Sequence, residues 1–244
     1  MTRLNKYLAE AGICSRREAD KLIASGKITV DGVIAQPGTQ VDYGQVVRVG
    51  KKVIQEAHDS RTTTVLLFNK PAGIVCTEDM REKQNVIRYL KYPTRITYAG
   101  RLDKDSEGLL VMTNDGDLIQ QMMRAKNQHE KEYKVTVHKE ITPEFIKAMS
   151  EGVRIRKVEK GKVILDEVTR PCTVTQIGKY TFSIILTQGL NRQIRRMSEA
   201  LGYKVTNLKR IRIMNLELGN IKVGAYREAT PEELIQLKHM LEMR

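Results

Sequence analysis

The sequence predicts an α+β protein in which a small N-terminal unit precedes a larger unit, built on a largely antiparallel mixed sheet with flanking helices. Short strand patterns joined by hairpin turns outnumber strand–helix–strand units, which favours antiparallel pairing. A polar stretch, residues 50–62, has no sustained apolar period and separates the two units. With 244 residues, 41% of them hydrophobic, the chain can bury a sizeable core.

The first unit is expected to span residues 1–49, with residues 50–62 as a linker. Ser15 and Glu18 have the spacing of a capping box, which predicts the start of a helix. Helices are predicted over 4–11 and from Ser15 to Gly26, and strands over 27–30, 33–35 and 46–49.

The second unit is expected to span residues 63–244. Its strands are predicted over 65–68, 96–99, 109–113, 133–137, 163–168, 173–177 and 180–186. Its helices are predicted over 85–91, 117–124, 143–152 and 193–201. A final helix is expected to begin at Thr230, because Thr230, Pro231 and Glu233 match a capping threonine, a first-turn proline and a reciprocal glutamate.

The charge of the chain favours a nucleic-acid partner. The chain has 42 Lys and Arg against 29 Asp and Glu, a formal net charge of +13. A membrane surface is the lesser alternative, and no apolar run approaches the roughly 20 residues that span a bilayer. The N-terminal residues also lack the hydrophobic centre of a signal peptide. We therefore expect a cytoplasmic protein that binds no membrane.

Metal, disulfide and nucleotide chemistry have little support in the sequence. The 3 cysteines are odd in number and widely separated, which argues against a disulfide framework and a CxxC zinc motif. The histidines show no HxxxH or HExxH spacing, and the GxxxxGK[ST] and GxGxxG loops are absent. We expect no metal and no small-molecule cofactor.

Polar residues concentrate in the stretch 100–116, which lies between two predicted strands. It begins GRLDKDSEGLL and contains Arg101, Asp103, Asp105 and Glu107. Loops between strands commonly carry reactive groups, although a solvated turn with surface charges explains the same spacing. Asp103 and Asp105 are a weak metal signal, because no histidine or further carboxylate stands at a fixed distance from them.

A second unusual stretch, GLNRQIRRM at 189–197, opens a predicted helix. The surrounding segment 185–212 is strongly basic, with Glu199 its only acid. Its basic residues are Arg192, Arg195, Arg196, Lys204, Lys209, Arg210 and Arg212. Arg192 lies three and four residues before the next two arginines, so the three share a helix face suited to phosphate groups. Plain solubilising charge is the alternative.

These stretches resemble pseudouridine synthases of the RsuA-type branch. Four segments carry the resemblance: Lys70–Gly73, GRLDKDSEGLL at 100–110, Lys131–Tyr133 and GLNRQIRRM at 189–197. The N-terminal sequence RLNKYLAEAGICSRREADKLIASGKITVDG is similar to the S4-type RNA-binding domain that this branch carries before its catalytic domain. The resemblance covers nearly the whole chain.

The resemblance implies a role for each matching residue. Asp103 is the catalytic aspartate, Tyr133 the active-site tyrosine and Arg195 the basic partner of the aspartate. Arg101 is the arginine expected to fill the gap left by an extruded base. The reaction breaks the C1′–N1 bond of a uridine and forms a C1′–C5 bond, without metal or cofactor. A guanidinium beside the aspartate would favour its ionised form.

Further basic residues are expected to bind RNA. In the predicted catalytic domain these are Lys70, Arg192 and Arg196, and in the S4-like domain they are Arg16 and Arg17. The wording KDSEGL and NRQIRRM is most similar to enzymes that modify large-subunit ribosomal RNA. We therefore expect a monomeric enzyme acting on a uridine in structured ribosomal RNA, and the sequence leaves open whether a transfer RNA is also a substrate.

Two other functions compete with this interpretation. A non-catalytic S4-bearing protein that binds or assembles ribosomes would explain the N-terminal unit but not the joint presence of GRLD, KEY and RQIR. A metal-dependent RNA nuclease would use Asp103 and Asp105 as ligands. Sensitivity to a chelator distinguishes the nuclease, because the isomerase needs no metal.

Overall fold

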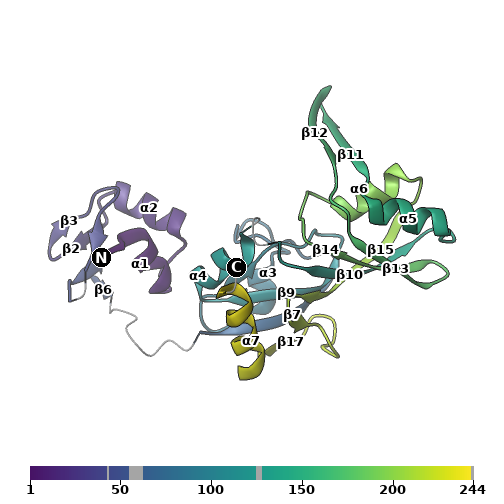
Figure 1. Cartoon of the computed structure of the whole chain (residues 1–244). Coiled ribbons are helices and arrows are strands. Elements are labelled where there is room, and N and C mark those ends of the chain that lie inside the picture. Colours follow the sequence, from purple (N-terminus) through teal and green to yellow (C-terminus); the bar gives the residue numbers. More distant parts are fainter. Residues whose placement is uncertain (43, 55–62, 125–127, 243–244) are drawn as a thin grey trace. The chain divides into compact units, whose positions relative to one another are not determined.

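A computed structural model describes residues 1–42, 44–54, 63–124 and 128–242. The chain forms two compact units, the first built mainly from residues 1–64 and the second mainly from the remainder (Figure 1). This organisation and the mixed sheet of the second unit confirm the predicted α+β class.

The first unit packs two helices against a four-stranded antiparallel sheet, beside a separate two-stranded one. The helices are α1 (Leu4–Glu10) and α2 (Arg16–Ala24), and the strands are β1 (Thr2–Arg3), β2 (Ile28–Val30), β3 (Val33–Ile34), β4 (Gln40–Val41), β5 (Val47–Val49) and β6 (Lys52–Ile54). The predicted capping box is present: the Glu18 amide donates to Ser15 Oγ at 3.2 Å, and the Ser15 amide donates to Glu18 Oε2 at 2.9 Å. Leu4, Leu8 and Ile28 are fully buried between the helices and the sheet.

The predicted linker begins too early. Residues 52–54 form β6, which pairs with β5, and Ile54 is buried in the core of the first unit. Because this strand has three residues and only one buried side chain, it produces no detectable apolar period. Residues 55–62 of the predicted linker lie outside the described residues.

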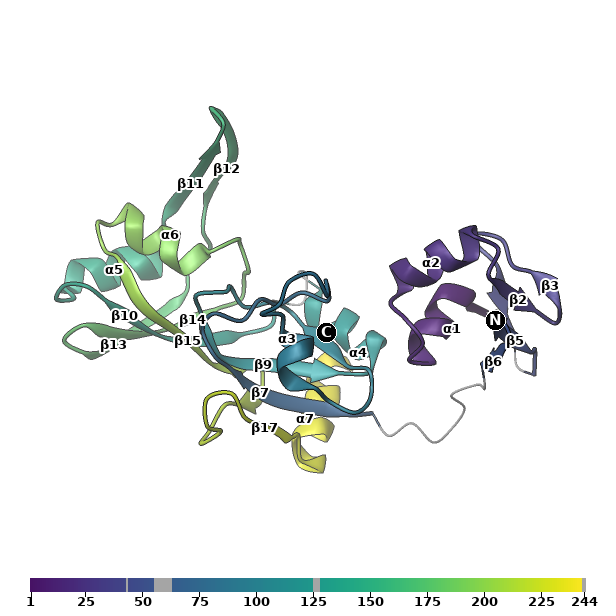
Figure 2. The same ribbon diagram turned by 180° about the vertical axis from the view of Figure 1, so that it is seen from behind.

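The second unit is built on a nine-stranded sheet in the order β13-β14-β10-β15-β9-β7-β17, with β16 paired to β15 and β8 paired to β9. Its strands are β7 (Val65–Lys70), β8 (Thr97–Ala99), β9 (Glu107–Thr113), β10 (Lys131–Val137), β13 (Thr173–Gly178), β14 (Thr181–Leu186), β15 (Val205–Ile213), β16 (Leu216–Glu217) and β17 (Tyr226–Glu228). The helices are α3 (Val86–Leu90), α4 (Gly116–Met123), α5 (Pro143–Glu151), α6 (Gln193–Ala200) and α7 (Pro231–Glu242). The predicted strand 163–168 is confirmed as β12 (Lys162–Val168). It pairs with β11 (Arg154–Glu159) in a separate hairpin that projects from the sheet (Figure 2).

Helices cover the two halves of this sheet separately. In one half, α5 and α6 pack on β10 and β14, where Phe145, Phe182 and Met197 belong to one buried cluster. In the other half, α4 and α7 cover β7 and β9, where Leu118 and Leu237 are buried. Figure 1 shows the same division, with α7 on the β7 side and α5 with α6 on the β10 side. The sheet therefore joins two hydrophobic cores.

The halves meet where β9 and β15 run parallel, whereas the other strand pairs of the described sheet are antiparallel. This pairing is short: Lys209 lies opposite Glu107, and Arg210 lies opposite Gly108. Gly108 has a φ of +106°, and a Cβ there would overlap the backbone carbonyl oxygen of Arg210. Only glycine satisfies both the dihedral angle and the close approach.

Gly108→Ala is expected to lower the free energy of unfolding by about 3 kcal/mol, because the new methyl group forces β9 and β15 apart in a strained backbone conformation. Gly178→Ala in β13 is the matched control, since the nearest atom to its new Cβ is Thr181 Cβ at an ordinary 3.7 Å. Urea unfolding of both variants measures the difference. Equal stability of the two variants would show that the β9–β15 contact does not require glycine.

Candidate active site

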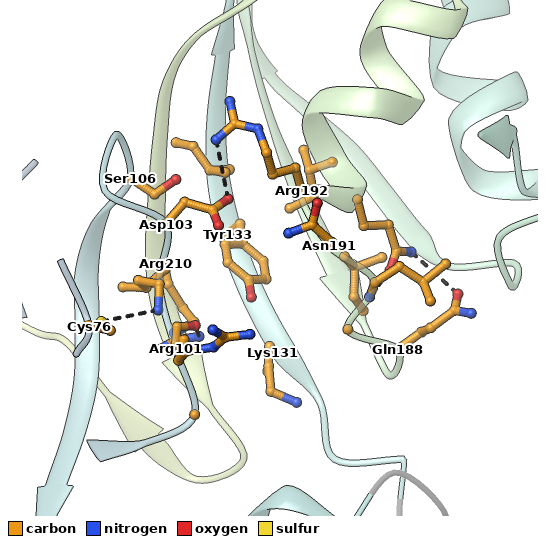
Figure 3. A pocket seen from close by; sticks show the side chains of 18 of the residues that line it. Cys76, Arg101, Asp103, Ser106, Lys131, Tyr133, Gln188, Asn191, Arg192 and Arg210 are labelled. Atoms are coloured by element: carbon orange, nitrogen blue, oxygen red, sulfur yellow. Dashed lines mark hydrogen bonds and ion pairs between the residues drawn. The ribbon is translucent and has the colours of Figure 1, made fainter. Parts of the chain in front are cut away.

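A cleft of about 700 Å³ lies in the second unit beside the junction of β9 and β15. Three segments form much of its wall: the loop 100–106 that joins β8 to β9, strand β10, and the segment 187–192 that joins β14 to α6. Figure 3 shows side chains from all three converging on one space. Two of these segments are the sequence motifs GRLD and GLNRQ, which the fold brings together.

Asp103 lies on the loop 100–106, with 35% of its side chain exposed to the cleft side. The Ser106 amide donates to the Asp103 carbonyl at 3.1 Å, which closes a turn immediately after the aspartate. Arg192 Nη1 lies 3.7 Å from Asp103 Oδ2. The carboxylate therefore faces the cleft with a guanidinium beside it.

Arg192 bonds more closely to Asp105. Its two terminal nitrogens donate to the two carboxylate oxygens of Asp105 at 2.9 Å each. These hydrogen bonds, with a smaller contribution from the charge of Arg195, hold the pKa of Asp105 below its usual range. Arg192 thus links two carboxylates that are two residues apart, and Asp105 stays ionised at neutral pH.

Arg195 does not pair with Asp103, and the predicted pairing is wrong in this structure. Arg195 Nε lies 3.4 Å from Asp105 Oδ2, and Nη2 donates to the Asp105 carbonyl at 2.9 Å and to Ser106 Oγ at 3.3 Å. The reason is its place on α6. Arg195 is in the first turn with a side chain only 10% exposed, so it reaches beneath the loop, whereas Arg192 precedes the helix with a φ of 52° and reaches over the loop.

Tyr133 lies in β10 and lines the middle of the cleft, between Asp103 and the side chains of Arg101 and Lys131 (Figure 3). It is half-buried, and its strand partners are Ile184 on β14 and Arg210 on β15. The structure therefore brings Asp103, Tyr133 and Arg101 to one cleft, as the resemblance implied. Their chemical roles stay predictions.

Lys70 is not placed to bind RNA, contrary to the sequence-based prediction. Its side chain is fully buried at the end of β7, and Nζ donates to the carbonyls of Pro71 at 2.8 Å and Ile74 at 2.9 Å. Burial lowers the pKa of this ammonium group. Lys70 therefore stabilises the turn 71–74, and its ammonium group is not available to contact RNA.

The remaining predicted RNA-binding residues are more accessible. Arg196 Nε and Nη2 donate to Asn191 at 2.9 and 3.2 Å, so Arg196 steadies the segment 187–192 while staying partly exposed. Arg16 and Arg17 are exposed in the first turn of α2 in the first unit. Contact of these three arginines with RNA stays a prediction.

Sequence reasoning gave no role to Arg210, which the structure places in the cleft wall with 2% exposure. Its Nε donates to the Leu109 carbonyl at 2.7 Å, and Nη1 donates to the Arg101 carbonyl at 3.3 Å. Arg210 therefore ties β15 to the loop that carries Arg101 and Asp103. In the sequence, Arg210 is one of several basic residues in the segment 185–212, and no pattern predicts that this arginine is buried.

Cys76 supports the same loop. The Leu102 amide donates to Cys76 Sγ at 3.4 Å, and burial raises the pKa of the thiol. The thiol is therefore protonated at neutral pH and serves as a small buried side chain.

Within the described ranges, no group of three or more His, Cys, Asp or Glu side chains has the arrangement of a metal site. In the same part of the chain, no helix is both long and apolar enough to cross a bilayer.

The cleft presents an aspartate beside a guanidinium, a strand tyrosine and an exposed arginine, which are the groups that the resemblance to pseudouridine synthases implied. A small two-helix unit precedes this part of the chain. Comparison with known proteins agrees. The family model described as RNA pseudouridylate synthase matches residues 64–200, and the S4 domain model matches residues 2–47. The chain belongs to the RNA pseudouridine synthases, in the RsuA-type branch that its motifs predicted.

Individual relatives are similar over nearly the whole of this chain. The dual-specificity RNA pseudouridine synthase RluF of Salmonella typhi is 47% identical over 241 residues, which cover 99% of this chain and 80% of the relative. The ribosomal large subunit pseudouridine synthase B of Bacillus subtilis is 36% identical over 249 residues, covering 98% of this chain and 96% of the relative. A crystal structure of a pseudouridylate synthase matches with a TM-score of 0.67 and 28% identity, over 97% of this chain and 100% of that chain.

Arg192→Ala is expected to lower kcat for pseudouridine formation by about 10-fold or more, because Asp103 loses the cation nearest to it. Arg192→Lys is expected to retain part of the rate, since charge survives but the two-pronged donor does not. Steady-state kinetics on a substrate RNA measures both effects.

Arg154→Ala is the matched control for this substitution. It removes an exposed arginine that also bonds an aspartate through two nitrogens, Asp166 at 2.8 and 3.2 Å, but on the projecting hairpin. Its kcat is expected to stay within about twofold of the unaltered protein. A raised KM with unchanged kcat for Arg192→Ala would mean that Arg192 acts on RNA binding alone.

Proposed function

We propose that this enzyme converts one specific uridine in structured large-subunit ribosomal RNA to pseudouridine in the cytoplasm, with Asp103 as the catalytic aspartate. The observation that carries the proposal is the convergence of Asp103, Tyr133 and Arg101 on one cleft of a protein of this family. The name of the 36% identical relative from Bacillus subtilis supports the choice of the large subunit.

The reaction requires a negatively charged group beside the sugar. The C1′–N1 bond of the uridine breaks, the uracil turns, a C1′–C5 bond forms, and the hydrogen at C5 moves to solvent while N1 gains one. Asp103 is proposed to act at this step, either covalently or by stabilising positive charge at C1′. The guanidinium of Arg192 lies 3.7 Å from this carboxylate and is its nearest cation.

The target uridine must leave its stack in order to enter the cleft. Extrusion of a base costs a few kcal/mol, which contacts elsewhere must offset. Arg101, exposed two residues before Asp103, is proposed to occupy the space that the base vacates. Tyr133 is proposed to stack on the extruded uracil and to assist removal of the C5 proton. Arg16, Arg17 and Arg196 are proposed to contact phosphates outside the cleft.

Site-by-site mapping of pseudouridine in RNA from cells with and without the protein tests the substrate. One large-subunit ribosomal position is expected to lose its modification when the protein is absent and to regain it when the protein is restored. Transfer RNA is mapped alongside, because the 47% identical relative is named as a dual-specificity enzyme. Unchanged large-subunit RNA would contradict the proposed substrate.

Asp103→Asn is expected to abolish conversion while RNA affinity stays nearly unchanged, because the amide keeps the size of the side chain but removes its charge. Asp166→Asn is the control, since it removes an exposed carboxylate on the projecting hairpin. Conversion is measured by mass spectrometry and affinity by filter binding. Turnover by Asp103→Asn within a few-fold of the unaltered enzyme would contradict the role of Asp103. Loss of activity in chelator, with RNA folding held constant, would favour the nuclease alternative.

A further inference from the structure

The basic residues of the cleft region fall into two groups. Arg192, Arg195 and Arg212 each have carboxylate partners, which are Asp103, Asp105, Glu130 and Glu132. Arg101, Lys131 and Arg210 also line the cleft. None of these three side chains has a carboxylate oxygen of the described residues within 4.0 Å, the distance that defines an ion pair. Arg192 at one end of the cleft is therefore neutralised, whereas Arg101, Lys131 and Arg210 are not.

A bulge in the sheet produces this separation. Glu132 pairs with Arg212, but the next residue, Tyr133, pairs with Arg210, so Ile211 is skipped. Because neighbouring residues of β10 point to opposite faces, Arg210 and Arg212 also point to opposite faces although they are two residues apart. Arg212 thereby meets Glu132 at 2.9 Å, and Arg210 stays on the cleft face with Tyr133.

The three unneutralised cations lie together. Lys131 precedes Tyr133 by two residues on β10 and shares its face of the sheet. Arg210 is the strand partner of Tyr133, and its Nη1 bonds the Arg101 carbonyl at 3.3 Å. In Figure 3, Arg101 and Lys131 lie at the end of the cleft away from Arg192, with Tyr133 between the two ends.

Two of these cations, Arg210 and Lys131, are buried or half-buried without sufficient compensation from the protein, whereas Arg101 is exposed. Arg210 is 2% exposed, and its Nη2 is buried without a hydrogen-bond partner among the described residues. Lys131 Nζ has one long bond, 3.4 Å to the His129 carbonyl. Burial lowers the pKa of Lys131, and the charge of Arg210 lowers it further. Buried charge without a counter-ion is costly, so an anion bound here would be strongly favoured.

We propose that Arg101, Lys131 and Arg210 form the binding site for a backbone phosphate next to the target nucleotide, with Lys131 as its direct ligand. The proposal rests on the proposed function, because phosphate is the anion that an RNA substrate brings to a cleft. A nucleotide held at its phosphate by Lys131 has its sugar and base directed past Tyr133 toward Asp103. Arg210 positions the loop through the Arg101 carbonyl and adds positive potential.

Lys131→Gln tests the ligand, and Lys134→Gln is its matched control on the same strand. Lys134 is exposed and, three residues further along β10, points to the opposite face of the sheet. Lys131→Gln is expected to raise KM and Kd about 10-fold and to leave kcat within about threefold. The slope of log K for RNA binding against log salt concentration is expected to become shallower by about 0.7 to 0.9, the change for one lost phosphate contact. Lys131→Arg is expected to retain most of the affinity because it keeps the charge. Circular dichroism confirms folding of each variant.

A chemically altered substrate locates the phosphate. A stem-loop RNA carrying the mapped uridine is made with a neutral methylphosphonate in turn at each linkage flanking that uridine. At one of these linkages, the methylphosphonate is expected to weaken RNA binding to the unaltered enzyme about 10-fold. The same change is expected to weaken binding to Lys131→Gln less than about twofold, because this variant has already lost the contact between Lys131 and the phosphate. Inorganic phosphate, added at up to about 10-fold the concentration of the assay salt, tests whether a free anion occupies the same site. If it displaces RNA equally well from the unaltered enzyme and from Lys131→Gln, Lys131 does not bind phosphate.

The two proposals fail in different ways. If the unaltered enzyme converts no large-subunit uridine, the proposed function fails irrespective of Lys131. If conversion is intact but Lys131→Gln has unchanged KM and salt dependence, or if each methylphosphonate weakens both proteins equally, the phosphate site is overturned. A fall in kcat alone, with unchanged Kd, would also overturn it, since Lys131 would then act on chemistry.

Discussion

The short parallel contact between β9 and β15 is the constraint on which the site depends. It requires a glycine at position 108, because the backbone of Arg210 occupies the space of a side chain. From this contact the Arg210 guanidinium reaches the carbonyls of Leu109 and Arg101, so a buried side chain connects the strand junction to the loop 100–106. Arg195 holds the same loop from α6, through the Asp105 carbonyl. The loop 100–106 is thus fixed from two sides by buried arginines.

This arrangement gives the cleft two electrostatically different ends. Arg192 neutralises the carboxylates at one end, where the glycosidic bond is proposed to break. The other end keeps the positive charge of Lys131 and Arg210, which suits a phosphate. A polar substrate placed across both ends has one orientation that satisfies the charges, so the groups proposed to bind RNA would also orient its nucleotide.

Much of this fold could be predicted from local patterns, since the capping box at Ser15 and most strands of the sheet depend on neighbouring residues. The motifs also identified the loop that carries Asp103. The details that failed depend on contacts between distant segments. Lys70 is buried because its ammonium group bonds two carbonyls of the turn after β7. Arg195 pairs with Asp105 and not with Asp103 because of how α6 packs against the loop. The bulge opposite Tyr133 could not be predicted, because it depends on how β10 and β15 pair and not on the order of residues in either strand.

Amide hydrogen exchange in an Arg210→Met variant tests the central claim most directly, because methionine keeps the apolar stem but removes the donors to Leu109 and Arg101. The account predicts that amides in the loop 100–106 exchange about 10-fold faster or more, while amides of β7 keep their protection. Unchanged exchange in this loop, in a variant that is folded and equally stable, would contradict the claim that Arg210 holds the loop 100–106 in place.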